Sequence, residues 1–173
     1  SEGPRRRPAG RDMRPAPPRG SYLRVAAFVA ACVAAAAYLH LRSENIPDPD
    51  GFYHIQHAAL YRTSGLGMTA FPWIPWSVIA THASDIWYGF HVLLVPFTLI
   101  EDPGLRIKVP GIVLTAAMLI ALGAAAVRLR MAKPFLWPFV VLLAAPNILY
   151  HLTMTRPHVL SMGLCALLFS FLV

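Results

Sequence analysis

Residues 109–127 read VPGIVLTAAMLIALGAAAV and contain no charged side chain. A helix of about 20 mostly apolar residues is long enough to cross the hydrocarbon core of a bilayer. Residues 22–41, YLRVAAFVAACVAAAAYLHL, form a second run of this length. Over the chain of 173 residues 57% are hydrophobic and 13% are charged, which is more apolar side chain than the interior of a soluble domain of this size holds. We therefore predict an all-α integral membrane protein, a helical bundle.

The N-terminal residues 1–21 are predicted to be a disordered basic tail on the cytoplasmic side. Residues 1–24 carry seven arginines against Glu2 and Asp12 and lack apolar periodicity. A basic run can indicate nucleic-acid binding, but this one leads directly into an apolar helix. We expect it to touch membrane lipid and to bind no nucleic acid. Because positive charge marks the cytoplasmic end of membrane helices, the first loop is expected to be external or periplasmic, in an inner or plasma membrane.

The order of apolar runs predicts about four transmembrane helices in residues 22–173. The basic residues 128–133, RLRMAK, favour a cytoplasmic position, so that 109–127 runs inward. Residues 85–100, DIWYGFHVLLVPFTLI, would then lie along the outer interface or re-enter within a large external loop, 43–108. The alternative is that 85–100 cross the membrane, which places RLRMAK outside. Residues 134–150 would return outward, and a further span would begin at 160.

The external loop opens on the stretch IPDPDGFYH, which holds two carboxylates, Asp48 and Asp50. Carboxylate oxygens are the ligands that Mg²⁺ and Mn²⁺ prefer, and a carboxylate can also act as a general base towards an acceptor. The alternative is that both acids belong to an ordinary turn and cap a helix over DGFYHIQHAALYRTS, which Gly65 ends.

Histidines and an arginine are the other candidate binding residues. Asp50, His54 and His57 have the spacing of one helix face, which suits a transition metal only weakly. We expect His54 to hydrogen-bond the loop acids or a phosphate and His57 to be structural. No chemistry is assigned to His82 or Asp85.

Arg156 and His158 follow in the stretch TRPH and are candidate phosphate-binding residues. An external arginine beside a membrane can hold a lipid-linked phosphate through two parallel hydrogen bonds. The alternative is that Arg156 simply extends its charge towards the interface while its aliphatic part stays in apolar surroundings.

These features together resemble the GT-C superfamily of membrane glycosyltransferases. The stretch DGFYHIQHAALYRTSG is similar to the first-loop motif of the oligosaccharyltransferase catalytic subunit, YGFHVLLVPF to its loop helix, and RLRMAKPFLWPFVVLLAAPNILYHLTMTRPHVLS to its later elements. The resemblance covers about residues 22–173 and implies the N-terminal portion of a longer protein.

The resemblance implies a sugar donor linked to polyprenyl phosphate, with transfer on the outer face of the membrane. It implies that Asp50, and secondarily Asp48, binds a divalent metal and contacts the acceptor. The second external loop of the family normally carries an acidic D-x-[DE] motif. Here the matching place reads TRPHVLSMG, with no carboxylate, which implies a metal site that is either incomplete or built differently.

A different class of function is also open, a non-catalytic membrane subunit. Such a protein would use its Ala-rich first helix and interfacial aromatic residues to pack against partner helices or lipid in a larger complex. The missing second acidic motif favours this alternative.

Overall fold

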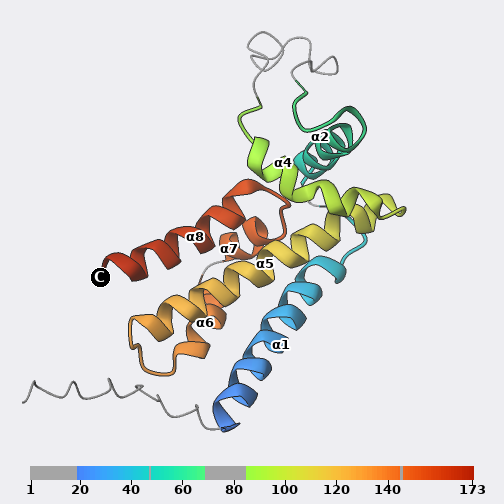
Figure 1. The fold of residues 1–173 in the computed structure, drawn as a ribbon. Helices are drawn as coiled ribbons and strands as arrows, with labels where there is room; N and C mark the ends of the chain where they lie inside the picture. The colour runs from blue at the N-terminus through green and yellow to red at the C-terminus, as the bar shows by residue number, and fades with distance from the viewer. Residues whose placement is uncertain (1–18, 47, 69–84, 145) are drawn as a thin grey trace, which may run out of the picture.

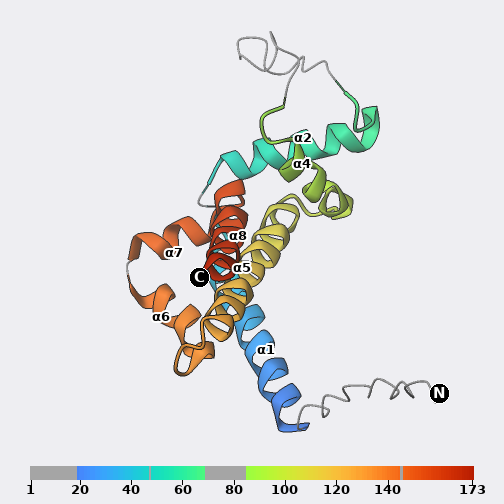
Figure 2. The same ribbon diagram turned by 60° about the vertical axis from the view of Figure 1, so that its left-hand side comes forward.

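The computed structural model describes residues 19–46, 48–68, 85–144 and 146–173, whose regular structure is helical, with no strand among them. The prediction of an all-α chain is confirmed for these residues. Figures 1 and 2 show long helices packed side by side, with a smaller helical unit at one end. The tail before residue 19 and the segment 69–84, which includes FPWIPW and His82, lie outside the described residues.

α5 (Pro103–Arg128) is the central helix, with a long helix on either side of it in Figure 1. The helix starts at Pro103, earlier than the predicted start at Val109. Asp102 occupies the N-cap position, and its side chain accepts a hydrogen bond from the Leu105 backbone N–H at 2.7 Å. Proline at the first helical position has a backbone angle already suited to a helix, so Asp102 and Pro103 together account for the early start.

α1 (Arg19–Leu41) packs along α5, as its Ala-rich composition predicts. Two glycines of α5 make the close approach possible. A Cβ atom on Gly123 would overlap the Phe28 ring, and one on Gly111 would overlap the His40 ring. Small residues at such contacts let two helices approach closely.

α8 (Pro157–Leu172) packs on the other side of α5, and this pair forms the most extensive helix contact of the described residues. Gly163 again permits the approach, because a Cβ there would lie 3.2 Å from the backbone of Met118. At the far end of the pair Arg128 donates a hydrogen bond to the Ser170 carbonyl at 2.7 Å.

Residues 134–150, expected to return outward across the membrane, do not form one continuous helix. They form a 3₁₀ turn (η2, Pro134–Leu136), then α6 (Trp137–Ala144) and α7 (Pro146–Leu152). Proline has no backbone N–H and disfavours helix at the preceding residue, so Pro146, which opens α7, separates α7 from α6. Figure 2 shows α6 and α7 as two separate helices beside α5 and α8.

α2 (Asp50–Ser64) confirms the helix predicted from DGFYHIQHAALYRTS. Gly65 ends it with φ at +93°, a conformation that glycine adopts without strain. Neither acid is the N-cap residue, since Pro49 holds that position. Asp48 instead accepts a hydrogen bond from the Asp50 backbone N–H at 3.1 Å, which fixes the turn just before the helix.

Residues 85–100 are divided into α4 (Tyr88–Leu94) and the 3₁₀ helix η1 (Val95–Leu99). Pro96 lies at the start of η1, where its ring is tolerated. In the interior of a longer α-helix the same ring would break the helix. Both short elements pack on α2, and Figure 1 shows this unit at one end of the long helices.

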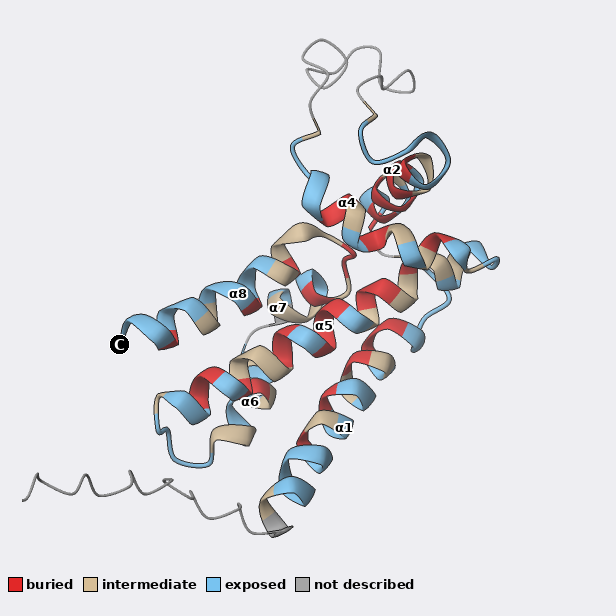
Figure 3. Ribbon diagram, viewed as in Figure 1, coloured by how far each residue is buried: buried red, intermediate tan, exposed pale blue. Residues whose placement is uncertain are grey.

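Within the described residues, two helices are long and apolar enough to cross a membrane, Ser21–Leu41 and Pro103–Arg128, whereas about four spans were expected. Figure 3 shows that α8 and α1 expose much of their outer surface, whereas α5 buries most of its length. The exposed surface of α8 is strongly apolar, since Leu164, Leu168, Phe169 and Phe171 are each more than half exposed.

Candidate functional site

Arg156 joins the two acids of the first loop. It lies in extended conformation directly before α8, and its Nε and Nη2 donate hydrogen bonds of 2.6 Å each to the two carboxylate oxygens of Asp48. Its Nη2 also lies 2.9 Å from Oδ2 of Asp50. Three of the residues nominated from the sequence thus meet in one charged cluster, although Arg156 is 108 positions from Asp48.

Asp48 and Arg156 form an ion pair that is partly shielded from water. Asp48 is 2% exposed and Arg156 34%. Burial on its own would raise the pKa of the Asp48 carboxyl, but the Arg156 hydrogen bonds and the Asp50 N–H outweigh burial and lower it. The same hydrogen bonds raise the pKa of Arg156. Both groups are therefore ionised at neutral pH, and the two parallel bonds fix the guanidinium plane.

Asp50 differs from Asp48 in its exposure. Its side chain is 53% exposed, and only its Oδ2 atom faces Arg156. Both oxygens of Asp48 accept from Arg156, so Asp50 is the acid with a carboxylate oxygen available to a further ligand. The structure does not test the predicted metal role of either acid.

His54 belongs to a chain of hydrogen-bonded side chains next to this cluster. Its Nδ1 lies 2.8 Å from Nε2 of His91 on α4, and Nδ1 of His91 lies 2.6 Å from Oδ2 of Asp85. The Asp85 carboxyl is an acceptor only, because hydrogen bonds from His91, Trp87 and Tyr61 lower its pKa despite burial, which raises it. His91 therefore donates from Nδ1 and accepts at Nε2, and His54 donates from Nδ1.

His54 is uncharged at neutral pH. Burial, with a smaller effect of His91, lowers its pKa to about 4 from 6.5. The charges of Asp48 and Arg156 also act on it, in opposite directions. Because its one ring proton lies on Nδ1 and is donated to His91, His54 offers a phosphate neither a positive charge nor a further N–H donor.

Asp85 and His91 were missed in the sequence analysis. Asp85 accepts hydrogen bonds from the Tyr61 hydroxyl at 2.8 Å and from the Trp87 N–H at 2.9 Å. The Trp87 bond is the one local signal, an acid accepting from the backbone at the start of a helix. The contacts with Tyr61 and His91 depend on how α2 and α4 pack, which no local pattern reveals.

A pocket of about 350 Å³ brings together Arg156 and His158, both predicted to bind phosphate. Ile148, Met154 and Met162 supply apolar walls. His158 Nε2 lies 3.3 Å from the His151 carbonyl, which orients its ring. Asp48, Asp50 and His54 do not line this pocket. Arg156 is therefore the residue that connects the pocket to the two acids.

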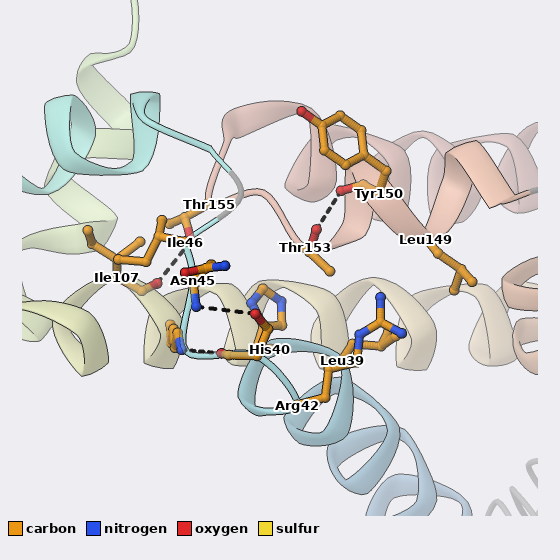
Figure 4. Close-up of a pocket in the computed structure, with 12 residues that line it drawn as sticks. Leu39, His40, Arg42, Asn45, Ile46, Ile107, Leu149, Tyr150, Thr153 and Thr155 are labelled. Atoms are coloured by element: carbon orange, nitrogen blue, oxygen red, sulfur yellow. Dashed lines mark hydrogen bonds between the residues drawn. The ribbon is translucent and has the colours of Figure 1, made fainter.

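A second pocket, of about 410 Å³, lies between the end of α1, the start of α5 and α7 (Figure 4). Leu39, Ile46 and Ile107 contribute apolar walls, and Arg42 and Lys108 supply positive charge. The Lys108 ammonium donates to the carbonyls of Ser43 and Glu44 and so ties the loop to α5. None of the nominated site residues lines it, and we assign the candidate chemistry to the Arg156 cluster instead.

Comparison of the chain with protein-family models, with curated proteins and with solved structures found no match.

Proposed function

We propose that the protein is a membrane glycosyltransferase resembling the GT-C superfamily, which transfers a sugar from a polyprenyl-phosphate-linked donor on the outer face of the membrane. The observation that carries the proposal is the cluster in which Arg156 pairs with Asp48 and Asp50. The first-loop acids and the second-loop arginine are distant in sequence, and a sugar-transfer site with a phosphate leaving group needs acid and arginine at one place.

In this proposal α1 and α5 cross the membrane, the basic tail is cytoplasmic, and the α2–α4 unit is external. The elements α6, α7 and α8 complete a bundle of about four spans. Support comes from the exposed apolar surfaces of α1 and α8, which a bilayer would cover. The cluster then sits where a lipid-linked phosphate arrives, at the edge of the apolar helices.

The ion pairs of the cluster indicate a different role for each residue. Asp50, half exposed, binds the metal or orients the acceptor. Arg156 and His158 face the donor phosphate from the pocket they share. Asp48 can serve as a further metal ligand only by releasing an oxygen from Arg156, so its first role is to hold the guanidinium in position. His54 stays neutral and donates its ring proton to His91.

The donor set fits Mg²⁺ or Mn²⁺, since Mg²⁺ is usually held by one or two carboxylates together with substrate phosphates. Such an ion would stabilise the charge that develops on the departing phosphate. Arg156 stabilises the same charge from a fixed position, which is the general way in which preorganised groups lower a barrier. The resemblance further implies inversion at the sugar carbon.

The test is sugar transfer by the full-length protein in membranes, with Asp50→Asn compared with Glu44→Gln. Glu44 is an exposed acid of the same loop and makes no side-chain ion pair in the part of the chain that the structure describes. Loss of one electrostatic contact at a reaction centre costs about 100-fold in rate. We expect that loss for Asp50→Asn and wild-type turnover for Glu44→Gln, and unchanged turnover of Asp50→Asn would remove Asp50 from the chemistry.

The second candidate is a non-catalytic membrane subunit. Two observations favour it: both oxygens of Asp48 are occupied by Arg156, and an alanine face of α1 is exposed, at Ala27, Ala31 and Ala34. Cysteine cross-linking from Ala34→Cys to another membrane protein, together with full activity of Asp50→Asn, would support this function over transfer.

A further inference from the structure

A second group of metal-ligating side chains lies between α2 and α4, apart from the Arg156 cluster. His57, Asp85 and His91 each offer one ligand atom, and these atoms all lie within 4.8 Å of one another. Nε2 of His57 is 3.5 Å from Oδ2 of Asp85, and Nδ1 of His91 is 2.6 Å from the same oxygen. The side chains are 0%, 1% and 0% exposed, respectively.

One of these two distances already has the length that a tetrahedral ion requires. With imidazole and carboxylate ligands at about 2.0–2.2 Å from Zn²⁺, tetrahedral geometry separates neighbouring ligand atoms by roughly 3.3 Å. The His57–Asp85 separation is already of that size. The shorter His91–Asp85 distance contains the Nδ1 proton of His91. On metal binding His91 would change tautomer and donate from Nε2 to Nδ1 of His54, which would then carry its own proton on Nε2. Nδ1 of His91 and Oδ2 of Asp85 would move apart around the ion.

The surroundings hold the three side chains in place. The rings of His57 and His91 stack with their centroids 4.2 Å apart and their planes inclined by 13°. Because a metal lies near the plane of each imidazole that binds it, one of the two rings would turn when the ion enters. His54 hydrogen-bonds the other nitrogen of His91 at 2.8 Å, and the Tyr61 hydroxyl hydrogen-bonds Asp85 at 2.8 Å. Hydrogen-bonded partners of this kind orient metal ligands and set the tautomer of a ligating histidine.

The protonation states of His57 and His91 are also those that metal ligands require. Burial, with a smaller effect of His91, lowers the pKa of His57 to about 4. Burial also lowers the pKa of His91, although Asp85 opposes this. Two neutral imidazoles and one carboxylate are the forms that bind a metal without first losing a proton to water.

We propose that His57, Asp85 and His91 form a binding site for a divalent transition metal of the zinc class, which ties α4 to α2. Two nitrogens and one oxygen suit Zn²⁺, whereas Mg²⁺ prefers oxygen ligands only. The site is therefore separate in place and in metal preference from the Asp50 site. Three protein ligands leave a fourth position for water.

The first measurement is metal content. The full-length protein, purified in detergent without a polyhistidine tag, is stripped with a chelator, loaded with Zn²⁺ and desalted. We expect one tightly bound Zn²⁺ per chain, loss of that ion in Asp85→Asn and in His57→Asn, and full retention in His151→Gln and Asp50→Asn. Asp85→Asn keeps a side-chain oxygen for the Trp87 N–H, and its circular dichroism shows whether the helices are still folded.

The second measurement gives the geometry directly and does not depend on any variant. X-ray absorption of the zinc-loaded protein should show two imidazoles and first-shell distances of about 2.0–2.2 Å. Zn²⁺ should also slow hydrogen exchange in α4. No retained Zn²⁺ in the wild type, or equal retention in Asp85→Asn and His57→Asn, would overturn the proposal. Retained Zn²⁺ with inactive sugar transfer would overturn only the proposed function.

Discussion

At the scale of single residues, Asp48 and Arg156 are not equivalent partners. Asp48 is 2% exposed, whereas Arg156 is 34% exposed. Removing the arginine leaves a buried carboxylate without its two charge-assisted bonds, while removing the acid leaves a cation that water can reach. The two truncations should therefore have different costs.

We predict that Arg156→Ala lowers the free energy of unfolding by about 3 kcal/mol, at the low end for a buried pair because the arginine is partly solvated. Asp48→Asn should cost about 1 kcal/mol, the net value of an ordinary hydrogen bond. Unfolding by denaturant, followed by circular dichroism in detergent, measures both. Equal costs for the two variants would show that Asp48 is hydrated in solution.

His54 makes the stability of the α2–α4 unit depend on pH. Its pKa is about 4 in the folded chain and about 6.5 when unfolded, so acid protonates the unfolded chain first. The stabilisation is complete above about pH 6.5 and is lost as the pH falls towards 4. The groups that act on His54 are His91 and Asp85 on the α4 side, Asp48 before α2 and Arg156 before α8.

We predict that hydrogen exchange in α2 and α4 speeds up between pH 6.5 and 4 in the presence of a chelator, after correction for the intrinsic exchange rate. His54→Asn keeps an N–H for His91 but has no titrating ring, so this variant should show a weaker dependence. If both proteins have the same pH profile, His54 is not the group responsible.

At the scale of helices, glycines decide how closely α1 and α5 pack. A Cβ on Gly123 would overlap the ring of Phe28, whereas a Cβ on Gly89 of α4 meets no atom within 4 Å. Phe28 is 7% exposed and stacks on Phe135 at 4.6 Å, so its ring has little room to move.

We predict that Gly123→Ala lowers the free energy of unfolding by about 1–3 kcal/mol, the usual cost of overpacking. Gly89→Ala, also within a helix, should be neutral or slightly stabilising because alanine favours helix. Thermal unfolding of the two variants makes the comparison. A harmless Gly123→Ala would mean that α1 does not approach α5 this closely.

The helices that local pattern predicts well are those with both an apolar period and clear ends. Residues 22–41, 109–127 and the helix after Asp50 were recognised, the last because Gly65 marks its end. The stretch 134–150 is divided into shorter helices that its average hydropathy does not reveal, because hydropathy conceals the effect of Pro146 on helix continuity. Apolar content alone does not report a break.

The candidate site was predictable in its parts and not in its pairings. Asp48, Asp50 and Arg156 were each nominated for charge at an apolar boundary, but their contact spans 108 positions and depends on how α8 meets the first loop. Asp85 was assigned no chemistry from the sequence. Its partners, Tyr61 and His91, come from two different helices, so no local pattern places them together. Packing, and not local sequence, creates those bonds.

At the scale of the whole molecule, the proposed sugar transfer depends on where the Arg156 cluster lies relative to the membrane. Figure 1 shows α2, α4 and the start of α8 at the opposite end of the long helices from the start of α1. A helix the length of α1, 23 residues, covers about 35 Å, enough to separate the two ends by a bilayer.

The most direct test is labelling with a membrane-impermeant maleimide in intact cells. In a background with Cys32 and Cys165 replaced by alanine, Asn45→Cys reports on the loop that leads to the cluster and Gly10→Cys on the basic tail. The account predicts that Asn45→Cys reacts from outside and that Gly10→Cys reacts only after permeabilisation. Reaction of both cysteines from the same side would contradict the external site and, with it, the proposed sugar transfer.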